Sequence, residues 1–179
     1  KAVWRDTPLP FQLQFFHRGF LFKERVDIAV VADGMATPLA YSPSQFSFGA
    51  APVPSEQDVG YAGMRIHAPI NRPDYFDEIC TFLGASYFRA VAKGQNYGLS
   101  ARGLALNTGD PGPEEFPLFK QFWIEQPGKD ASAIIVHALL DSPSAAAALR
   151  FVITPGDETL FDTRMRLYPR VDLDRAGIA

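Results

Sequence analysis

The stretch FLGASYFRAVAKGQNYGLSARGLAL, residues 82–106, decides the fold expected for this chain. Two apolar runs, Tyr87–Ala92 and Leu99–Leu106, flank a polar turn that contains glycine. Apolar runs rich in aromatic residues, joined by such a turn, are typical of a β-hairpin. We therefore predict a hairpin with one arginine in each strand, Arg89 and Arg102.

The rest of the chain continues this pattern of short apolar runs between residues that break secondary structure. Its 179 residues include 15 Phe, 15 Pro and 14 Gly, and the prolines and glycines are spread along the chain. Aromatic and β-branched residues favour strands, and frequent breakers keep the strands short. The length suits one domain with a substantial core. We predict an all-β fold, an antiparallel sandwich or barrel of about eleven strands.

Several segments carry clear strand signals. Phe11–Phe15 alternates apolar and polar residues, which is the pattern of a half-buried strand. The pair Asp33-Gly34 between two apolar runs predicts a hairpin. Near the C-terminus, three apolar runs separated by short turns predict a meander. These runs are 133–140, 147–154 and 159–168. The charged tail, 170–179, is expected to fray.

Two segments are less regular. Tyr75–Phe82 follows Asp74, a residue that can cap a helix, and the sequence leaves open whether the segment is a helical turn or a loop. Residues 42–59 carry Ser, Pro, Gln and acidic residues around Phe46 and Phe48. We predict a long surface loop there with an aromatic anchor.

Composition narrows the function classes. The net charge of −3 does not favour a nucleic-acid-binding surface. Cys80, the single cysteine, cannot form an intrachain disulfide. The three histidines, His17, His67 and His137, lie in separate predicted strands without the spacing of metal ligands, so neither a metal nor a cofactor is expected. No signal peptide or membrane span is visible, and because the chain starts at Lys1 without Met, this says nothing about export.

Carboxylates and arginines are the remaining candidates for chemistry. Glu114, Glu115 and Glu125 bracket a group of aromatic residues, and Asp141 opens a turn. The aromatic residues are Phe116, Phe119, Phe122 and Trp123. Sugar-cleaving sites use paired carboxylates, and aromatic faces stack on sugar rings. In the alternative interpretation Glu114 and Glu115 are solubilising loop residues, and Phe119 and Trp123 belong to the core.

The two strand arginines also allow two interpretations. Arg89 and Arg102 could donate forked hydrogen bonds to the hydroxyl or carboxylate groups of a ligand. Alternatively, each could pair with a nearby acidic residue or cover apolar surface with its stem. The sequence alone leaves both interpretations open.

Five stretches resemble, in order, the periplasmic glucan biosynthesis proteins of the G and D type. They are LGASYFR (83–89), YGLSARGLA (97–105), EEFP (114–117), FWIE (122–125) and ALLDSP (138–143). The resemblance runs from about Phe11 to Ala179. The resemblance implies that the protein is one of a family of exported periplasmic proteins of Gram-negative bacteria. These proteins are needed to make osmoregulated periplasmic glucans, which have β-1,2-linked backbones. Some members are inverting endo-β-1,2-glucanases.

The resemblance also implies a domain organisation. Family proteins have a large N-terminal β-sandwich of the carbohydrate-active supersandwich type, followed by an immunoglobulin-like domain, and they are much longer than this chain. Residues 1–179 resemble the first part of the large domain, so the sandwich is expected to be incomplete here. The remainder of that domain and the C-terminal domain are expected to be absent.

The resemblance places the acid and base of the family's enzymes beyond residue 179. Inverting hydrolysis needs two carboxyl groups about 6.5–9.5 Å apart. We therefore predict no catalytic residue on this chain and expect it to be inactive alone. The residues predicted to contact glucan are Tyr87, Arg89, Tyr97, Ser100, Arg102, Glu115, Trp123 and Asp141.

Two functions follow from the resemblance for the full-length protein. It acts on β-1,2-glucan, as an inverting endo-β-1,2-glucanase, or it is a non-catalytic factor that binds glucan and assists its assembly. The expected partners are β-1,2-glucan and, as a second candidate, the glucan synthase of the inner membrane. No nucleic acid is expected.

Overall fold

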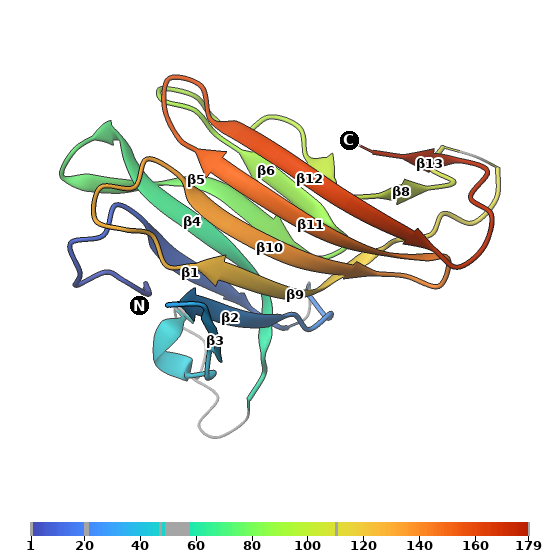
Figure 1. Cartoon of the computed structure of the whole chain (residues 1–179), viewed down its shortest axis with the longest axis horizontal. Coiled ribbons are helices and arrows are strands. Elements are labelled where there is room, and N and C mark those ends of the chain that lie inside the picture. Colours follow the sequence, from blue (N-terminus) through green and yellow to red (C-terminus); the bar gives the residue numbers. More distant parts are fainter. Residues whose placement is uncertain (1, 20–21, 47, 49–57, 110, 179) are drawn as a thin grey trace.

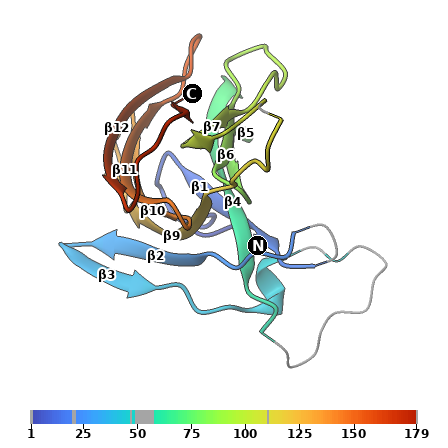
Figure 2. The same cartoon turned by 90° about the vertical axis from the view of Figure 1, so that its right-hand side faces the viewer.

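The computed structural model describes residues 2–19, 22–46, 48, 58–109 and 111–178. Two β-sheets pack face to face as two layers, which Figure 2 shows edge-on. The all-β sandwich predicted from the sequence is confirmed. In the described part of the chain, no helix is long and apolar enough to cross a membrane.

Sheet 1 has five antiparallel strands in the order β1-β4-β5-β6-β7. These are β1 (Gln12–His17), β4 (Tyr61–Arg72), β5 (Tyr75–Leu83), β6 (Tyr87–Ala90) and β7 (Ala101–Arg102). The sheet lies behind the other one in Figure 1.

Sheet 2 has six strands in the order β12-β11-β10-β9-β2-β3 and faces the viewer in Figure 1. These are β12 (Leu160–Pro169), β11 (Ala145–Thr154), β10 (Ile134–Asp141), β9 (Leu118–Glu125), β2 (Asp27–Ala32) and β3 (Met35–Pro38). Its pairs are antiparallel except β2 with β9, which run parallel. A short third sheet pairs β8 (Ala105–Leu106) with β13 (Ala176–Gly177), and a 3₁₀ turn, η1, spans Pro43–Gln45.

The core lies between sheets 1 and 2, and Phe82 of β5 stands at its centre. The Phe82 ring centroid lies 5.4 Å from that of Phe122 on β9 and 5.2 Å from that of Phe151 on β11. All three side chains are fully buried. Such inclined ring pairs add about 0.5–1.5 kcal/mol each beyond the burial of their surface. The aromatic residues thus join the two layers.

The clearest strand signals are confirmed. In β1, Leu13 and Phe15 are buried, while Gln12 and Gln14 on the opposite face are only partly covered. β2 and β3 form the hairpin predicted at Asp33-Gly34, where both residues have positive φ (53° and 75°), as a tight hairpin turn requires. The C-terminal meander is formed by β10, β11 and β12.

Two local predictions were wrong. The segment interpreted as a helical turn or a loop is strand β5, because its backbone pairs with β4 on one side and β6 on the other. The tail does not simply fray, since Ala176–Gly177 pairs with β8. The long surface loop predicted for 42–59 lies partly outside the described residues, at 47 and 49–57. Its aromatic anchor Phe46 packs against Tyr61, with ring centroids 5.8 Å apart.

The central hairpin is present, but its strands are shorter than predicted. β6 ends at Ala90, and it pairs with β7 through Tyr87 with Arg102 and Phe88 with Ala101. Gly103 then interrupts the second strand, where its amide donates to the carbonyl of Ser86 at 2.9 Å. Residues 91–100 therefore form an irregular loop beside sheet 1.

Candidate functional site

A hollow of about 640 Å³ lies over the outer face of sheet 1, and we call it the groove. Its floor follows a row of cross-strand partners that crosses four strands. Gln14 on β1 pairs with Arg65 on β4. Arg65 in turn pairs with Thr81 on β5, and Thr81 pairs with Arg89 on β6. Side chains alternate between the two faces of a strand, so the buried neighbours of these residues enter the core while the row itself faces outward. Arg65, Thr81 and Arg89 line the groove.

Glu78 is the carboxylate of the groove, and it is held from two sides. Arg65 Nη1 lies 3.2 Å from Glu78 Oε2, and the Tyr97 hydroxyl donates to Glu78 Oε1 at 2.8 Å. Burial raises the pKa of Tyr97, and the hydrogen bond to Glu78 raises it further. The phenol therefore stays protonated at neutral pH and acts as a donor. The Arg65 guanidinium also stacks over the Phe16 ring, 4.3 Å from its centroid, which limits its movement.

Arg89 and Ser100 define the other side of the groove. Arg89 Nε donates to Ser100 Oγ at 2.6 Å, which ties the loop after β6 back to the strand. Arg89 is an exposed residue, and in the described part of the chain its two terminal nitrogens have no hydrogen-bond partner. They are therefore free to donate to a ligand in the groove.

Four of the eight residues predicted to contact glucan line the groove: Tyr87, Arg89, Tyr97 and Ser100. Arg102 lies beside it but is buried, and it forms an ion pair with Glu114. Its guanidinium sits between two rings, 5.1 Å from the centroid of Tyr87 and 5.0 Å from that of Phe116. For Arg102, the structure therefore favours the interpretation in which a strand arginine pairs with an acidic residue.

Glu115 and Asp141 are engaged elsewhere. Glu115 accepts hydrogen bonds from the amide of Ser144 at 2.9 Å and from its hydroxyl at 2.6 Å. Partial burial raises the pKa of Glu115, but hydrogen bonds from Ser142 and Ser144 outweigh it, and the net shift is downward. Asp141 accepts from Arg170 Nη2 at 2.7 Å. Neither residue is part of the groove lining.

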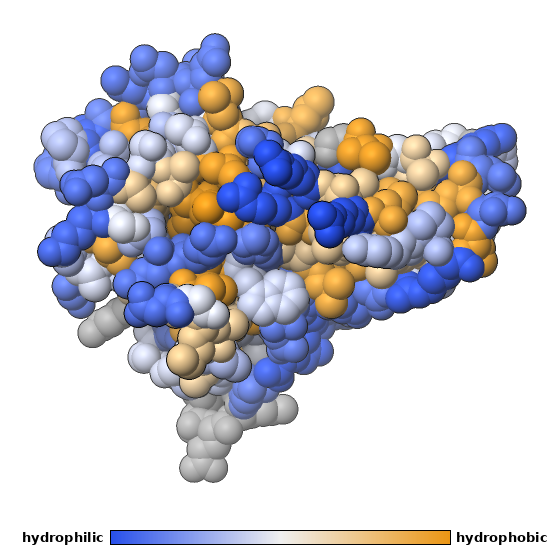
Figure 3. All heavy atoms as spheres, in the orientation of Figure 1, coloured by the Kyte–Doolittle hydropathy of each residue, from blue (hydrophilic) through white to orange (hydrophobic). Residues whose placement is uncertain are grey.

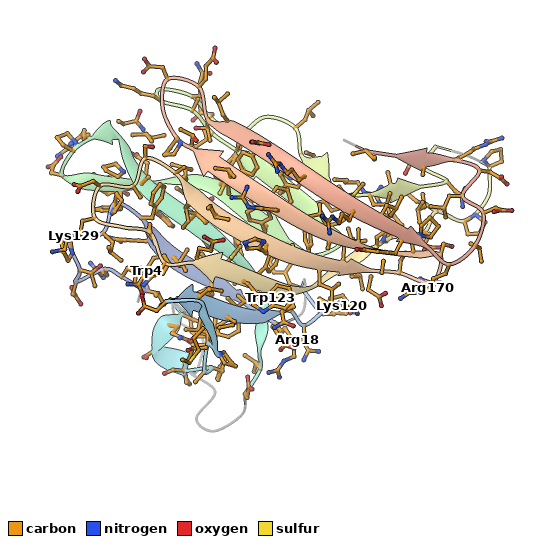
Figure 4. The ribbon with its side chains drawn as sticks, in the orientation of Figure 1. Trp4, Arg18, Lys120, Trp123, Lys129 and Arg170 are labelled. Carbon is orange, nitrogen blue, oxygen red and sulfur yellow. The ribbon has the colours of Figure 1, made fainter. Side chains whose placement is uncertain are left out.

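Trp123 lies on the opposite side of the sandwich from the groove. Its neighbours Phe122 and Ile124 are buried in the core, so Trp123 points out of sheet 2. Figure 4 shows it on β9 in the front layer, well separated from Arg170 near the other end of the sheet. Figure 3 shows that hydrophilic and hydrophobic residues are mixed on this face. Phe119 is a core residue, as the alternative interpretation held, but Trp123 is only partly buried and is not part of the core. Phe122 is also buried, whereas Phe116 is 48% exposed.

Metal ligation has no support in the described residues, where no group of three His, Cys, Asp or Glu side chains could hold an ion. His137 is paired with Glu125, with Nε2 2.7 Å from Oε1. Cys80 is fully buried, and burial raises the pKa of its thiol, so this residue behaves as a core side chain.

The whole chain, residues 1–179, matches the family model described as periplasmic glucan biosynthesis protein, MdoG. The chain belongs to this family. It is 62% identical over 180 residues to glucans biosynthesis protein G of Bradyrhizobium diazoefficiens, an alignment that covers 100% of this chain and 36% of that protein. It is 52% identical over 181 residues to glucans biosynthesis protein G of Vibrio cholerae, covering 99% of this chain and 33% of that protein. The resemblance inferred from the sequence is confirmed, and the chain spans about a third of the length of these relatives.

Three residues that line the groove, Arg65, Glu78 and Phe16, were not among the site residues predicted from the sequence. Arg65 stands between the buried residues Met64 and Ile66, and a charged residue inside so apolar a strand is a signal that could have identified it. Glu78 lies in the segment that was not recognised as a strand, so its face of the sheet could not be assigned.

Proposed function

We propose that the groove over sheet 1 binds a β-1,2-linked glucan in the periplasm, and that the whole protein acts on this polymer in the synthesis of osmoregulated periplasmic glucans. The observation that carries this proposal is the polar network of the groove: Arg65, Glu78 and Tyr97 in one chain of hydrogen bonds, with Arg89 and Ser100 beside it. A sugar hydroxyl both donates and accepts hydrogen bonds, so a carboxylate held by a guanidinium and a phenol, with the guanidinium of Arg89 in the same groove, suits it.

The apolar lining of the groove supports the same ligand. Phe16, Tyr87 and Tyr97 all border the hollow, and Tyr87 is 36% exposed. Sugar rings carry C–H faces as well as hydroxyls, and aromatic side chains provide an apolar surface for them. The volume of about 640 Å³ lies within the usual range of about 300–1,000 Å³ for ligand sites.

The groove also bears on catalysis. Inverting hydrolysis needs a pair of carboxyl groups about 6.5–9.5 Å apart. Among the described residues that line the groove, Glu78 is the one carboxylate, and it is engaged by Arg65 and Tyr97. Our proposal therefore gives this chain the role of binding and orienting glucan. If the full-length protein is an inverting endo-β-1,2-glucanase, its acid and base come from other parts of the protein. Those parts belong to a larger sandwich domain, which is followed by an immunoglobulin-like domain.

Because Glu78 is the one carboxylate in the described lining of the groove, a second candidate is a non-catalytic protein that binds nascent glucan and assists the membrane-bound glucan synthase. Such a factor needs the same groove but no acid and base. The two candidates therefore share the binding step and differ only in whether the polymer is cut.

Calorimetric titration of the full-length protein with linear β-1,2-glucan tests the shared step. We expect Arg89→Ala to weaken binding about tenfold, because it removes a charged donor. Arg164→Ala is the matched control, since Arg164 is an exposed arginine on β12 of sheet 2. An Arg89→Ala protein that is folded and binds as tightly as the control would contradict the groove assignment.

Product analysis after incubation with the same polymer separates the two candidates. Shorter products with inverted anomeric configuration support the hydrolase. Intact polymer, together with binding in the titration, supports the assembly factor. Failure of the wild-type protein to bind β-1,2-glucan at all would overturn the proposed function.

A further inference from the structure

A second hollow, of about 510 Å³, lies on the same outer face of sheet 1. Gln12, Gln14 and His67 are among its lining residues. Gln12 is the cross-strand partner of His67, and Gln14 is the partner of Arg65, which lines the groove. The two hollows are therefore neighbours along β1 and β4, and they meet at the Gln14–Arg65 pair.

His67 lines this second hollow and carries a buried acceptor that has no partner among the described residues. The residue is only 8% exposed, and its Nδ1 lies 3.3 Å from the carbonyl oxygen of Phe76. A carbonyl oxygen can only accept, so Nδ1 carries the hydrogen. Burial lowers the pKa of His67, which leaves Nε2 as a neutral acceptor at pH 7. Nε2 is buried, and the described residues offer it no hydrogen-bond partner. A buried acceptor without a partner calls for a ligand or ordered water.

The other polar groups of the second hollow suit a hydroxyl-rich ligand, and the guanidinium of Arg5, which also lines the hollow, adds further hydrogen-bond donors. In the described structure, the side-chain amides of Gln12 and Gln14 have no hydrogen-bond partners, and each can donate and accept. The carboxylate of Asp74 is neutralised by Arg72, with Nη2 2.6 Å from Oδ2. Phe46 and Tyr75, the latter 61% exposed, add aromatic surface.

We propose that the second hollow is a further sugar-binding subsite, which holds glucosyl units of the same glucan chain that occupies the groove. Gln12 and Gln14 bind hydroxyl groups there, and His67 Nε2 accepts a hydrogen bond from one of them. This inference rests on the proposed function and adds to it a consequence: affinity depends on the length of the glucan, because only a long chain reaches both hollows.

A length series of linear β-1,2-gluco-oligosaccharides, titrated into the full-length protein, tests the subsite. For the wild-type protein we expect affinity to rise with length and then to level off. For the double variant Gln12→Ala/Gln14→Ala we expect affinity to level off at a shorter length, with the longest oligosaccharides bound about tenfold more weakly and the shortest unchanged. Gln126→Ala is the control, since this exposed glutamine follows β9 in sheet 2.

A second measurement is made on the wild-type protein and uses a variant only to assign one resonance. Nitrogen NMR of ¹⁵N-histidine-labelled protein reports the Nε2 resonance of His67, assigned by its loss in His67→Gln. We expect this resonance to shift when a long oligosaccharide is added and to stay in place with a short one.

The outcomes separate this inference from the proposed function. Wild-type affinity that is independent of length, or equal losses at every length in the double variant, would overturn the subsite while leaving the groove intact. An unmoved His67 resonance at saturating long glucan would overturn the role of His67. Absence of binding at every length would overturn the proposed function itself.

Discussion

The hydroxyl of Tyr97 donates a hydrogen bond to Glu78 at 2.8 Å and so joins an irregular loop to strand β5. Glu78 is also paired with Arg65 on β4. The groove therefore depends on three successive segments of the chain, with its carboxylate held in place before any ligand arrives. Such preorganisation reduces the conformational entropy that is lost when a ligand binds.

Tyr97→Phe tests this link. The change removes one hydrogen bond to a charged acceptor while keeping the ring, so we expect the free energy of unfolding to fall by about 1–2 kcal/mol. We also expect weaker glucan binding, because Glu78 loses one of its two fixed partners. Urea unfolding of the full-length protein measures the first effect and calorimetric titration the second. Unchanged binding with lowered stability would show that the bond is only structural.

Arg102→Ala is expected to act mainly on stability. Arg102 is 8% exposed and paired with Glu114, so its removal leaves a partly buried carboxylate without its cation. We expect a loss of about 3 kcal/mol in urea unfolding. Arg170→Ala breaks the more exposed pair with Asp141 and is expected to cost less than about 1 kcal/mol. Equal effects of the two substitutions would contradict this ranking.

His67 predicts a dependence of stability on pH. Burial lowers its pKa, so the folded protein disfavours the protonated form, whereas in the unfolded chain the group titrates near its ordinary value of about 6.5. Stability contributed by neutral His67 is therefore present above about pH 6.5 and is lost as the pH falls below it. Urea unfolding of wild type and His67→Phe at pH 7.5, 6.5 and 5.5 measures this. The wild-type protein should lose more stability on acidification than the variant, and parallel losses would contradict the assignment.

Local patterns predicted much of the fold and less of the site. The alternation in β1 and the C-terminal meander could be recognised because each depends on neighbouring residues. β5 was missed because Asp74 looked like a helix cap, whereas pairing with two flanking strands decides its structure. The parallel pairing of Asp27 with Gln121 joins residues far apart in sequence, and no local pattern predicts it.

For the site too, features that depend on neighbouring residues were predicted, and features that depend on strand pairing were not. Tyr87, Arg89, Tyr97 and Ser100 belong to one continuous stretch, and the structure places them together. Trp123 and Asp141 were grouped with them by motif, but they lie on sheet 2. Arg65 and Glu78 join the groove only through the register of β4 and β5, which the sequence motifs do not contain.

The β4–β5 pairing that builds the groove floor can be tested at Gly63. A Cβ atom added there would lie 2.2 Å from the carbonyl oxygen of Phe82, a backbone atom that cannot move without disturbing the pairing of the two strands. We expect Gly63→Ala to lower the free energy of unfolding by about 3 kcal/mol.

Gly98→Ala is the matched control for that substitution. Gly98 adjoins Tyr97 in the groove loop, but a Cβ there meets nothing within 4 Å, and its φ is not positive. We expect a change within about 0.5 kcal/mol. Thermal and urea unfolding of both full-length variants measure the difference. If Gly63→Ala were as stable as Gly98→Ala, the close approach of β4 to the Phe82 carbonyl would be refuted, and with it the register that brings Arg65 and Thr81 side by side.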